Sequence, residues 1–273
     1  MKNEEALKKV SVVPNIINMN HFKQITVVAA VNNHLVLTSN LLHSSLLNQV
    51  NVQFIQAEGF SNASQAYNYG IDQSIGDYLI FAHQDVYIPS SWQGCLEKAL
   101  LQLKDQPWAV LGIIGKTKKN EVVGRTWSTG LKSQVGHKID KPVPVESIDE
   151  LLIVVNKKTD IRFDENLPGF HLYGTDIVQT AIKMGYGAYV IDAPVIHNSL
   201  PYLKYDKGFV ESYRFMRKKW KSILPITTLV TTINRSGWPL WKKLIKQYFK
   251  RDNRSFYKRL DDPAAKAKEL GYE

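Results

Sequence analysis

The chain has 273 residues, of which 44% are hydrophobic and 22% are charged. These are the proportions of a globular protein, so they exclude a disordered or collagen-like chain. The single cysteine, Cys95, excludes a disulfide framework and any metal site built from several cysteines. The longest apolar runs have the length of strands, well below the roughly 20 residues that cross a bilayer. Because the charged N-terminus also lacks the apolar core of a signal peptide, we expect a cytoplasmic protein.

The net charge of +10 is unevenly distributed along the chain. Residues 1–200 hold 17 basic and 18 acidic side chains, whereas residues 201–273 hold 18 basic and 7 acidic ones. A protein that binds DNA or RNA over its whole surface would not have a near-neutral body, so we expect no nucleic-acid partner. A basic tail on such a body is typical of contact with an anionic surface.

The first half of the chain alternates between short β-branched runs and segments with helical spacing of apolar residues. This alternation predicts an α/β domain in which helices flank a mainly parallel, Rossmann-like sheet. We expect strands at residues 25–31, 50–55, 76–82 and 109–114, and helices at 34–49, 61–74 and 90–103.

Polar clusters follow three of the expected strands. They are Asn32-Asn33, Gln56-Ala57-Glu58 and His83-Gln84-Asp85. In open α/β sheets, ligands bind at the carboxyl ends of the strands, so the clusters predict a binding site there. The plainer interpretation is that strands simply end in polar loops.

The second half is less regular. Residues 115–148 are rich in Gly, Lys, Ser and Thr without a clear period, and we expect a long excursion over the edge of the sheet. A strand at 147–157, a loop at 167–173, a helix at 175–184 and a strand at 188–191 follow. We therefore divide the chain into a domain of residues 1–200, with halves at 22–114 and 115–200, and a basic helical extension at 201–273.

Four stretches carry a resemblance to a known family: Ile25–Asn33, Asn62–Asp85, Phe170–Asp176 and Gly185–His197. They contain an Ala-x-Asn-x-Gly helix, a Gly-Asp-Tyr strand start and a His-Gln-Asp triplet, in that order. Together they resemble the inverting family-2 glycosyltransferases, which have the nucleotide-sugar-binding GT-A fold, in a bacterial subgroup with His-Gln-Asp in place of Asp-x-Asp. The resemblance covers about residues 22–200. It implies transfer of a sugar from a nucleotide-diphosphate donor, most simply a UDP-sugar.

The resemblance also implies a divalent cation, Mn²⁺ or Mg²⁺, that stabilises the diphosphate leaving group. It assigns Asp85 as a ligand, with His83 in the place of the family's first aspartate and His197 in that of a metal-binding histidine. Side chains two positions apart on an extended segment face the same way, so His83 and Asp85 can face one site. An imidazole ligand such as His83 favours Mn²⁺ over Mg²⁺. There are alternatives for each residue. His83 could bind a ribose or phosphate instead of the metal, or His83 and Asp85 could only cap the next turn. His197 could have a structural role alone.

Inversion by direct displacement requires a base that takes the proton of the acceptor hydroxyl. The resemblance assigns this role to Asp176, although Thr175 replaces an acidic residue that is frequent in the family. An aspartate in the first turn of a helix also stabilises the helix itself, so capping is the alternative.

For the donor, the resemblance implies that Glu58 and Asn33 bind the ribose or base. It places Asn68 and Gly70 at the nucleotide-sugar site, where they shape the helix beside the diphosphate.

Residues 239–250 combine apolar residues at helical spacing with four lysines on the other side. This pattern is typical of an interfacial helix on anionic lipid, and equally of a helix packed on the domain with a basic outer face. With the resemblance, it suggests a glycan or lipid-linked acceptor in bacterial surface polysaccharide synthesis, at the inner face of the membrane. The rival hypothesis is a nucleotide-sugar-binding or scaffolding protein that kept the fold and lost catalysis.

Overall fold

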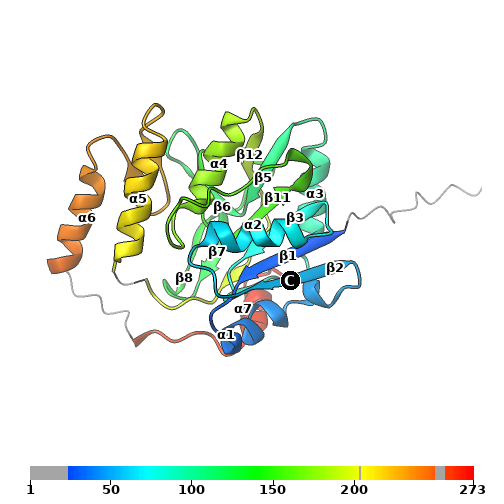
Figure 1. Ribbon diagram of the computed structural model, residues 1–273. Coiled ribbons are helices and arrows are strands. Elements are labelled where there is room, and N and C mark those ends of the chain that lie inside the picture. Colours follow the sequence, from blue (N-terminus) through cyan, green and yellow to red (C-terminus); the bar gives the residue numbers. More distant parts are fainter. Residues whose placement is uncertain (1–23, 203, 250–255) are drawn as a thin grey trace, which may run out of the picture.

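The computed structural model describes residues 24–202, 204–249 and 256–273. A seven-stranded sheet with the order β2-β1-β3-β11-β5-β12-β9 forms the centre of the molecule (Figure 1). Its strands are β1 Ile25–Ala30, β2 Val52–Ala57, β3 Tyr78–Ala82, β5 Trp108–Gly112, β9 Val143–Pro144, β11 Leu152–Asn156 and β12 Gly187–Val190. The expected α/β fold with flanking helices is confirmed, and the strands of the first half lie within two residues of their expected positions.

Parallel pairing is confined to two parts of this sheet. Strand β1 runs parallel to β2 and β3, and β12 runs parallel to β5. Between these parts, β11 runs antiparallel to both β3 and β5. The sheet is therefore mixed rather than mainly parallel, because β11 enters it from a second sheet instead of from a crossover helix.

Helices cover both faces of the central sheet. On one face α2 (Ala63–Gln73) and α4 (Tyr173–Lys183) pack around Val28, and on the other α1 (His34–Ser39) and α3 (Trp92–Gln102) pack around Val27 and Ala29. Successive side chains of a strand point to opposite faces, so one apolar run serves both cores.

The helix expected at residues 34–49 is shorter than its apolar spacing predicts. It ends at Ser39 and continues as two 3₁₀ helices, Leu41–His43 and Ser45–Asn48. Asn40 and Ser44 are buried between them and hydrogen-bond main-chain groups: Nδ2 of Asn40 donates to Val36 O, and Oγ of Ser44 accepts from Ile88 N. Asn and Ser compete with helical hydrogen bonding in this way.

The expected excursion at residues 115–148 is instead a second sheet, so the expectation of irregular structure there is wrong. Its order is β10-β6-β7-β13-β4, with β8 paired to β7. Gly124 in β7 adopts φ +77°, and a Cβ there would lie 2.2 Å from Ile113 O, so glycine permits the turn of the strand. The strands are β4 Val86–Tyr87, β6 Ile114–Lys116, β7 Val122–Ser128, β8 Ser133–His137, β10 Ser147–Ile148 and β13 Ile196–His197.

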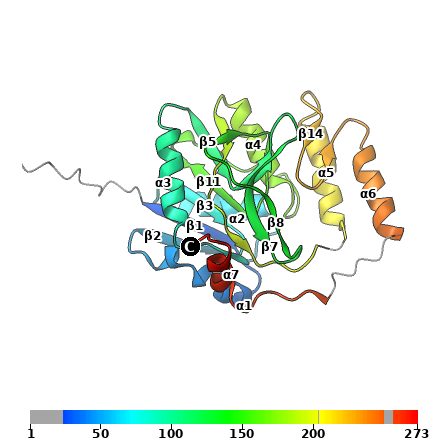
Figure 2. The same ribbon diagram turned by 180° about the vertical axis from the view of Figure 1, so that it is seen from behind.

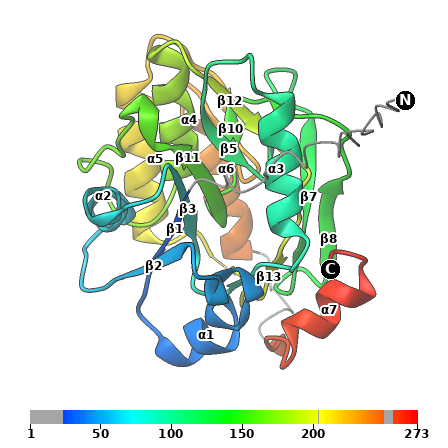
Figure 3. The ribbon, with the colours of Figure 1, turned by 90° about the vertical axis from the view of Figure 1, so that its right-hand side faces the viewer.

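The basic extension divides into two parts that pack at different places (Figures 2 and 3). In the first part, α5 (Lys207–Lys219), the hairpin β14 (Ile226–Thr227) and β15 (Thr232–Ile233), and α6 (Trp238–Phe249) join the same core cluster as α2 and α4.

The second part contains α7 (Pro263–Glu269), which packs with Tyr272 against Tyr87 and Ile196, beside β4 and β13. Within the described residues, no helix combines the length and apolarity needed to span a bilayer.

Candidate functional site

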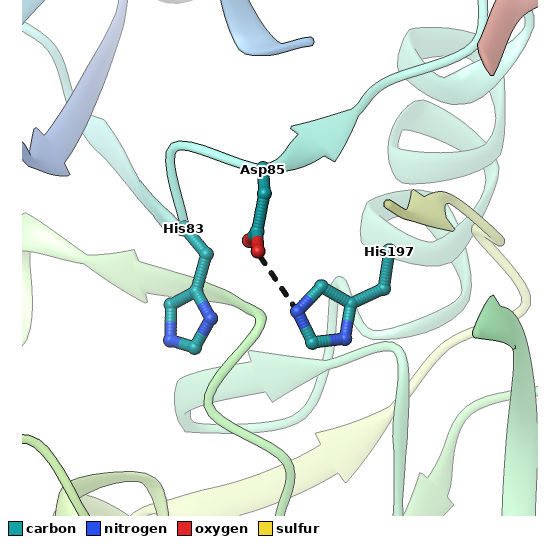
Figure 4. Close-up of side chains that lie close together, drawn as sticks. All are labelled: His83, Asp85 and His197. Atoms are coloured by element: carbon teal, nitrogen blue, oxygen red, sulfur yellow. Dashed lines mark ion pairs between the residues drawn. The ribbon is translucent and has the colours of Figure 1, made fainter. Parts of the chain in front are cut away.

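Two histidines and an aspartate converge at the carboxyl end of β3. His83 follows β3, Asp85 precedes β4, and His197 ends β13. Antiparallel pairing of β13 with β4 sets His197 opposite Val86, and this register brings residues distant in sequence side by side. Figure 4 shows the three side chains pointing toward one another; one ligand atom from each lies within 4.8 Å of the others. Nε2 of His197 lies 3.4 Å from Oδ1 of Asp85.

The cluster is electrostatically organised around the carboxylate. Burial opposes the charged form of Asp85, but His197, His83 and Arg259 outweigh it and hold the pKa of Asp85 well below its ordinary value. Burial lowers the pKa of His83, which favours the neutral imidazole. Burial acts on His197 in the same direction, but the carboxylate of Asp85 outweighs it and raises the pKa of His197.

These donors fit a divalent cation. The carboxylate of Asp85 and the neutral imidazole of His83 are both in the form that binds metal, and His197 would join them by losing its proton. Nε2 of His83 lies 2.8 Å from the hydroxyl of Tyr173, and such a contact orients an imidazole so that the other ring nitrogen faces a ligand.

A cavity of about 420 Å³ opens beside the cluster. It is walled by the ends of β1, β2 and β3 and by the loop before α4, which contributes Phe170. Gln84 holds this end together, because its Oε1 accepts from the main-chain N–H groups of Asn32 and Asn33 at 3.1 and 3.0 Å. The lining residues are Ala30, Val31, Asn32, Ala57, Gly59, Phe60, Tyr67, His83, Gln84, Asp85, Phe170 and Tyr173.

Of the residues expected to bind the donor, His83 and Asp85 line the cavity and two others lie at its edge. Glu58 lies between the lining residues Ala57 and Gly59, is exposed, and contacts Nε2 of His34 at 3.0 Å. Asn33 adjoins the lining residue Asn32, but its side chain caps α1 by accepting from Val36 N at 3.1 Å.

Asn68 and Gly70 are not among the residues that line the cavity, and both lie in α2, whose Tyr67 does line it. Nδ2 of Asn68 donates to Phe163 O at 2.9 Å, and its Oδ1 accepts from Phe163 N at 3.0 Å, which ties α2 to the loop before α4. A Cβ on Gly70 would lie 2.4 Å from Val28 Cγ1, so glycine allows α2 to approach β1 closely. Both residues support the wall of the site.

Asp176 is buried away from the cavity, and in this arrangement both of its oxygens are occupied. Oδ2 accepts from Nζ of Lys219 at 2.8 Å, and Oδ1 accepts from Nε1 of Trp220 at 2.7 Å. Burial raises the pKa of Asp176, although Lys219 and Trp220 act in the opposite direction. In this arrangement Asp176 joins α4 to α5, and its role as the base stays a prediction.

The positively charged side chain beside Asp85 is that of Arg259, which was not predicted from the sequence because it lies in the distant C-terminal segment. Nη2 of Arg259 lies 3.8 Å from Oδ2 of Asp85, and its Nη1 donates to Asn198 O at 3.0 Å. Asn198 fixes this segment further: its Oδ1 accepts from Leu260 N at 2.7 Å and its Nδ2 donates to Leu260 O at 2.9 Å. Only the asparagine next to His197 hinted at this contact in the sequence.

A second missed residue is Glu150, between β10 and β11 and in contact with the start of α4. Its main-chain oxygen accepts from the hydroxyl of Tyr173 at 3.2 Å, and a Cβ on Gly174 would lie 3.2 Å from its Cγ. Burial and the neighbouring Asp149 raise the pKa of Glu150 to about 8, although the N–H groups of Gly174 and Leu172 lower it. No recognisable motif in the sequence marks Glu150.

A model of the glycosyltransferase-like family matches residues 26–220, which is more than half of the chain. A curated relative from Fuscovulum blasticum, described as "ATP synthase subunits region ORF 6", is 26% identical over 162 residues. The match covers 55% of this chain and 62% of the relative, so it spans less than two thirds of the relative's length.

Several solved structures resemble the fold distantly. GalNAc-T7 with UDP, GalNAc and Mn²⁺ has a TM-score of 0.47 and 13% identity over 76% of this chain and 52% of that one. The mannosyltransferase PcManGT from Pyrobaculum calidifontis, with GDP-Man and Mn²⁺, has a TM-score of 0.44 and 10% identity over 73% and 61%. TarS 1-349 from S. aureus has a TM-score of 0.41 and 14% identity over 82% and 80%. Likenesses of this size say nothing about substrate or metal.

Proposed function

The chain belongs to the glycosyltransferase-like family and has the GT-A fold, and from this premise we propose that it transfers a sugar from a nucleotide-diphosphate donor to an acceptor hydroxyl with inversion. The observation that carries the proposal is the His83–Asp85–His197 cluster beside the 420 Å³ cavity at the strand ends. Ligands of open α/β sheets bind at this edge. A UDP-hexose is the donor that we propose first.

The cluster would hold a divalent cation, Mn²⁺ in preference to Mg²⁺. When bound, such a cation neutralises the charge that develops on the departing diphosphate. Arg259 adds a fixed positive charge on the side of Asp85, and its guanidinium is suited to phosphate oxygens. Tyr173 orients His83, and Gln84 fixes the strand ends that wall the cavity.

The acceptor hydroxyl needs a base, and Glu150 is a candidate for it beside Asp176. Asp176 would first have to release Lys219 and Trp220. Glu150 lies next to Tyr173, which lines the cavity, and its pKa of about 8 suits a group that exchanges a proton near neutrality. Glu150→Gln should therefore reduce turnover while leaving donor affinity unchanged.

The wider role that we propose is the extension of a glycan or a lipid-linked acceptor in bacterial surface polysaccharide synthesis, on the cytoplasmic side of the membrane. The proposal rests on the family and on the open cavity beside Phe170, which leaves room for an acceptor.

The decisive experiment measures the melting temperature with UDP, GDP and their sugars, with and without Mn²⁺. A ligand that binds only the folded state raises the melting temperature by mass action. We expect a shift with one nucleotide class that requires metal and disappears in Asp85→Asn, together with slow metal-dependent hydrolysis of that donor. Asp72→Asn is the matched control, because Asp72 pairs with Arg162 in an exposed position. A shift without hydrolysis or transfer would instead support the non-catalytic scaffold.

A further inference from the structure

Helix α6 has one side that packs on the protein and one that does not. Leu240 is buried and Leu244 packs against the same core cluster, while Gln247 pairs with the main chain of Tyr205. Five other large apolar residues recur three or four positions apart, so they share another side of the helix. They are 43% to 85% exposed, and they are Trp238, Trp241, Ile245, Tyr248 and Phe249. The helix lies at the periphery of the molecule (Figures 1 and 2).

A basic groove of about 420 Å³ adjoins this apolar side. It runs between β6, the hairpin β14–β15 and α6, and four lysines line it: Lys116, Lys242, Lys243 and Lys246. None of the lining residues is acidic, and no carboxylate in the described ranges forms an ion pair with these lysines. Oγ1 of Thr231, a buried lining residue, has no hydrogen-bond partner among the described residues.

We propose that the apolar side of α6 and the four lysines form one docking surface for an anionic lipid bilayer. Trp, Tyr, Phe and Ile next to lysines on one helix are the composition of a helix that lies in the interface plane, with its apolar side among acyl chains and its lysines at the phosphates. The charge is complementary, because the docking surface carries lysines without acids. A protein partner with an apolar surface would leave these four lysines without negatively charged partners. A nucleic acid would pair with the lysines but would leave the apolar side of α6 in water.

Helix α6 also connects to the candidate site, through Gln247 on its packed side and a row of aromatic contacts. Gln247 on α6 holds Tyr205, whose ring lies 5.9 Å from that of Tyr202, and the Tyr202 ring lies 5.7 Å from His171. His171 follows Phe170, which lines the cavity. For the proposed transferase, on which this step alone rests, the connection favours an acceptor carried by the membrane.

The test is co-sedimentation of the full chain with vesicles of phosphatidylglycerol and phosphatidylcholine, compared with vesicles of phosphatidylcholine alone. We expect binding to the anionic vesicles that weakens at high salt, because salt screens exposed charges. The triple change Lys242→Glu, Lys243→Glu and Lys246→Glu should weaken binding at least about tenfold. The double change Trp241→Ser and Phe249→Ser should weaken it to a similar degree, with an unchanged melting temperature because both side chains are exposed.

The control variants change other parts of the surface. One set reverses three positive charges, and another removes an exposed apolar side chain. Lys98→Glu, Lys104→Glu and Lys158→Glu change exposed lysines outside the groove, and Leu101→Ser removes an exposed apolar residue of α3. Equal loss in these controls would overturn the proposal. Equal binding to neutral vesicles, or retention of a DNA or RNA oligonucleotide in place of vesicles, would also overturn it. The vesicle assay contains no sugar donor, so its result does not depend on the proposed transfer. If the protein bound the vesicles but transferred no sugar in a separate assay, the proposed function alone would be contradicted.

Discussion

Asp85 and Asp176 occupy two regions that are chemically similar and differently built. Each aspartate faces a basic side chain and a ring nitrogen: Arg259 and His197 for Asp85, Lys219 and Trp220 for Asp176. The Asp85 side chain is 15% exposed and its partners are 3.4 and 3.8 Å away. The Asp176 side chain is 3% exposed, with donors at 2.8 and 2.7 Å.

This difference in hydrogen bonding indicates which of the two carboxylates can bind a cation or a ligand. The oxygens of Asp85 make only long contacts and can bind a cation or a ligand, whereas each oxygen of Asp176 already accepts a short hydrogen bond that a ligand would have to compete with. Removing a buried carboxylate costs its hydrogen bonds, although Lys219 keeps a second partner in Asp164, 2.8 Å from its Nζ. We therefore expect Asp85 to matter for activity and Asp176 for stability.

Asp85→Asn should have the largest effect. We expect transfer to fall about a thousandfold, the loss that follows removal of a group stabilising developing charge. The free energy of unfolding should also fall, because the low pKa of Asp85 means that its charge stabilises the folded protein, so turnover is compared per folded molecule. Turnover and the melting temperature are measured together, with Asp72→Asn as the control. Retained turnover would remove Asp85 from the mechanism, and chelation of the metal should reproduce the loss.

Asp176→Asn should lower the free energy of unfolding by about 1 kcal/mol, because the hydrogen bonds to Lys219 and Trp220 are weakened while Lys219 keeps its ion pair with Asp164. Denaturant unfolding measures this change. Turnover per folded molecule should change little below the new melting temperature. If stability were instead preserved and turnover lost, Asp176 would be the base that the sequence suggested, and the contrast with Asp85 would fail.

Arg259→Gln should weaken donor affinity about tenfold, because a charge-assisted hydrogen bond to phosphate is lost. Titration of the nucleoside diphosphate by calorimetry measures this, and Arg259→Lys should recover part of it. Arg214→Gln, an exposed change on α5, is the control. Equal affinity in Arg259→Gln would mean that the C-terminal segment only packs beside the site.

The smallest effect concerns Glu150 and pH. Its folded pKa of about 8 lies above the ordinary 4.5, so between these values the folded protein keeps a proton that the unfolded chain has lost. The stability from this group is complete below pH 4.5 and declines as pH rises toward 8. Melting temperatures between pH 5 and 9 should therefore fall less in Glu150→Gln than in the unaltered protein. A parallel decline in both would exclude the raised pKa.

The sequence by itself determined the strands of the first half and the polar residues at their ends. Short β-branched runs such as Ile25–Ala30 have few alternatives to a buried strand, and His83 and Asp85 lie two positions apart immediately after one. The helix at residues 238–249 was also predictable, because its apolar spacing is local.

Only the tertiary structure determined which residues of distant segments face one another. The second sheet forms from strands of two to seven residues that come from distant parts of the chain, from β4 at residue 86 to β13 at residue 197. His197 reaches Asp85 through the pairing of β13 with β4, Arg259 through Asn198, and Asp176 is enclosed by α5. Each of these contacts joins segments that are distant in sequence, and local patterns specify the elements but not the register in which they meet.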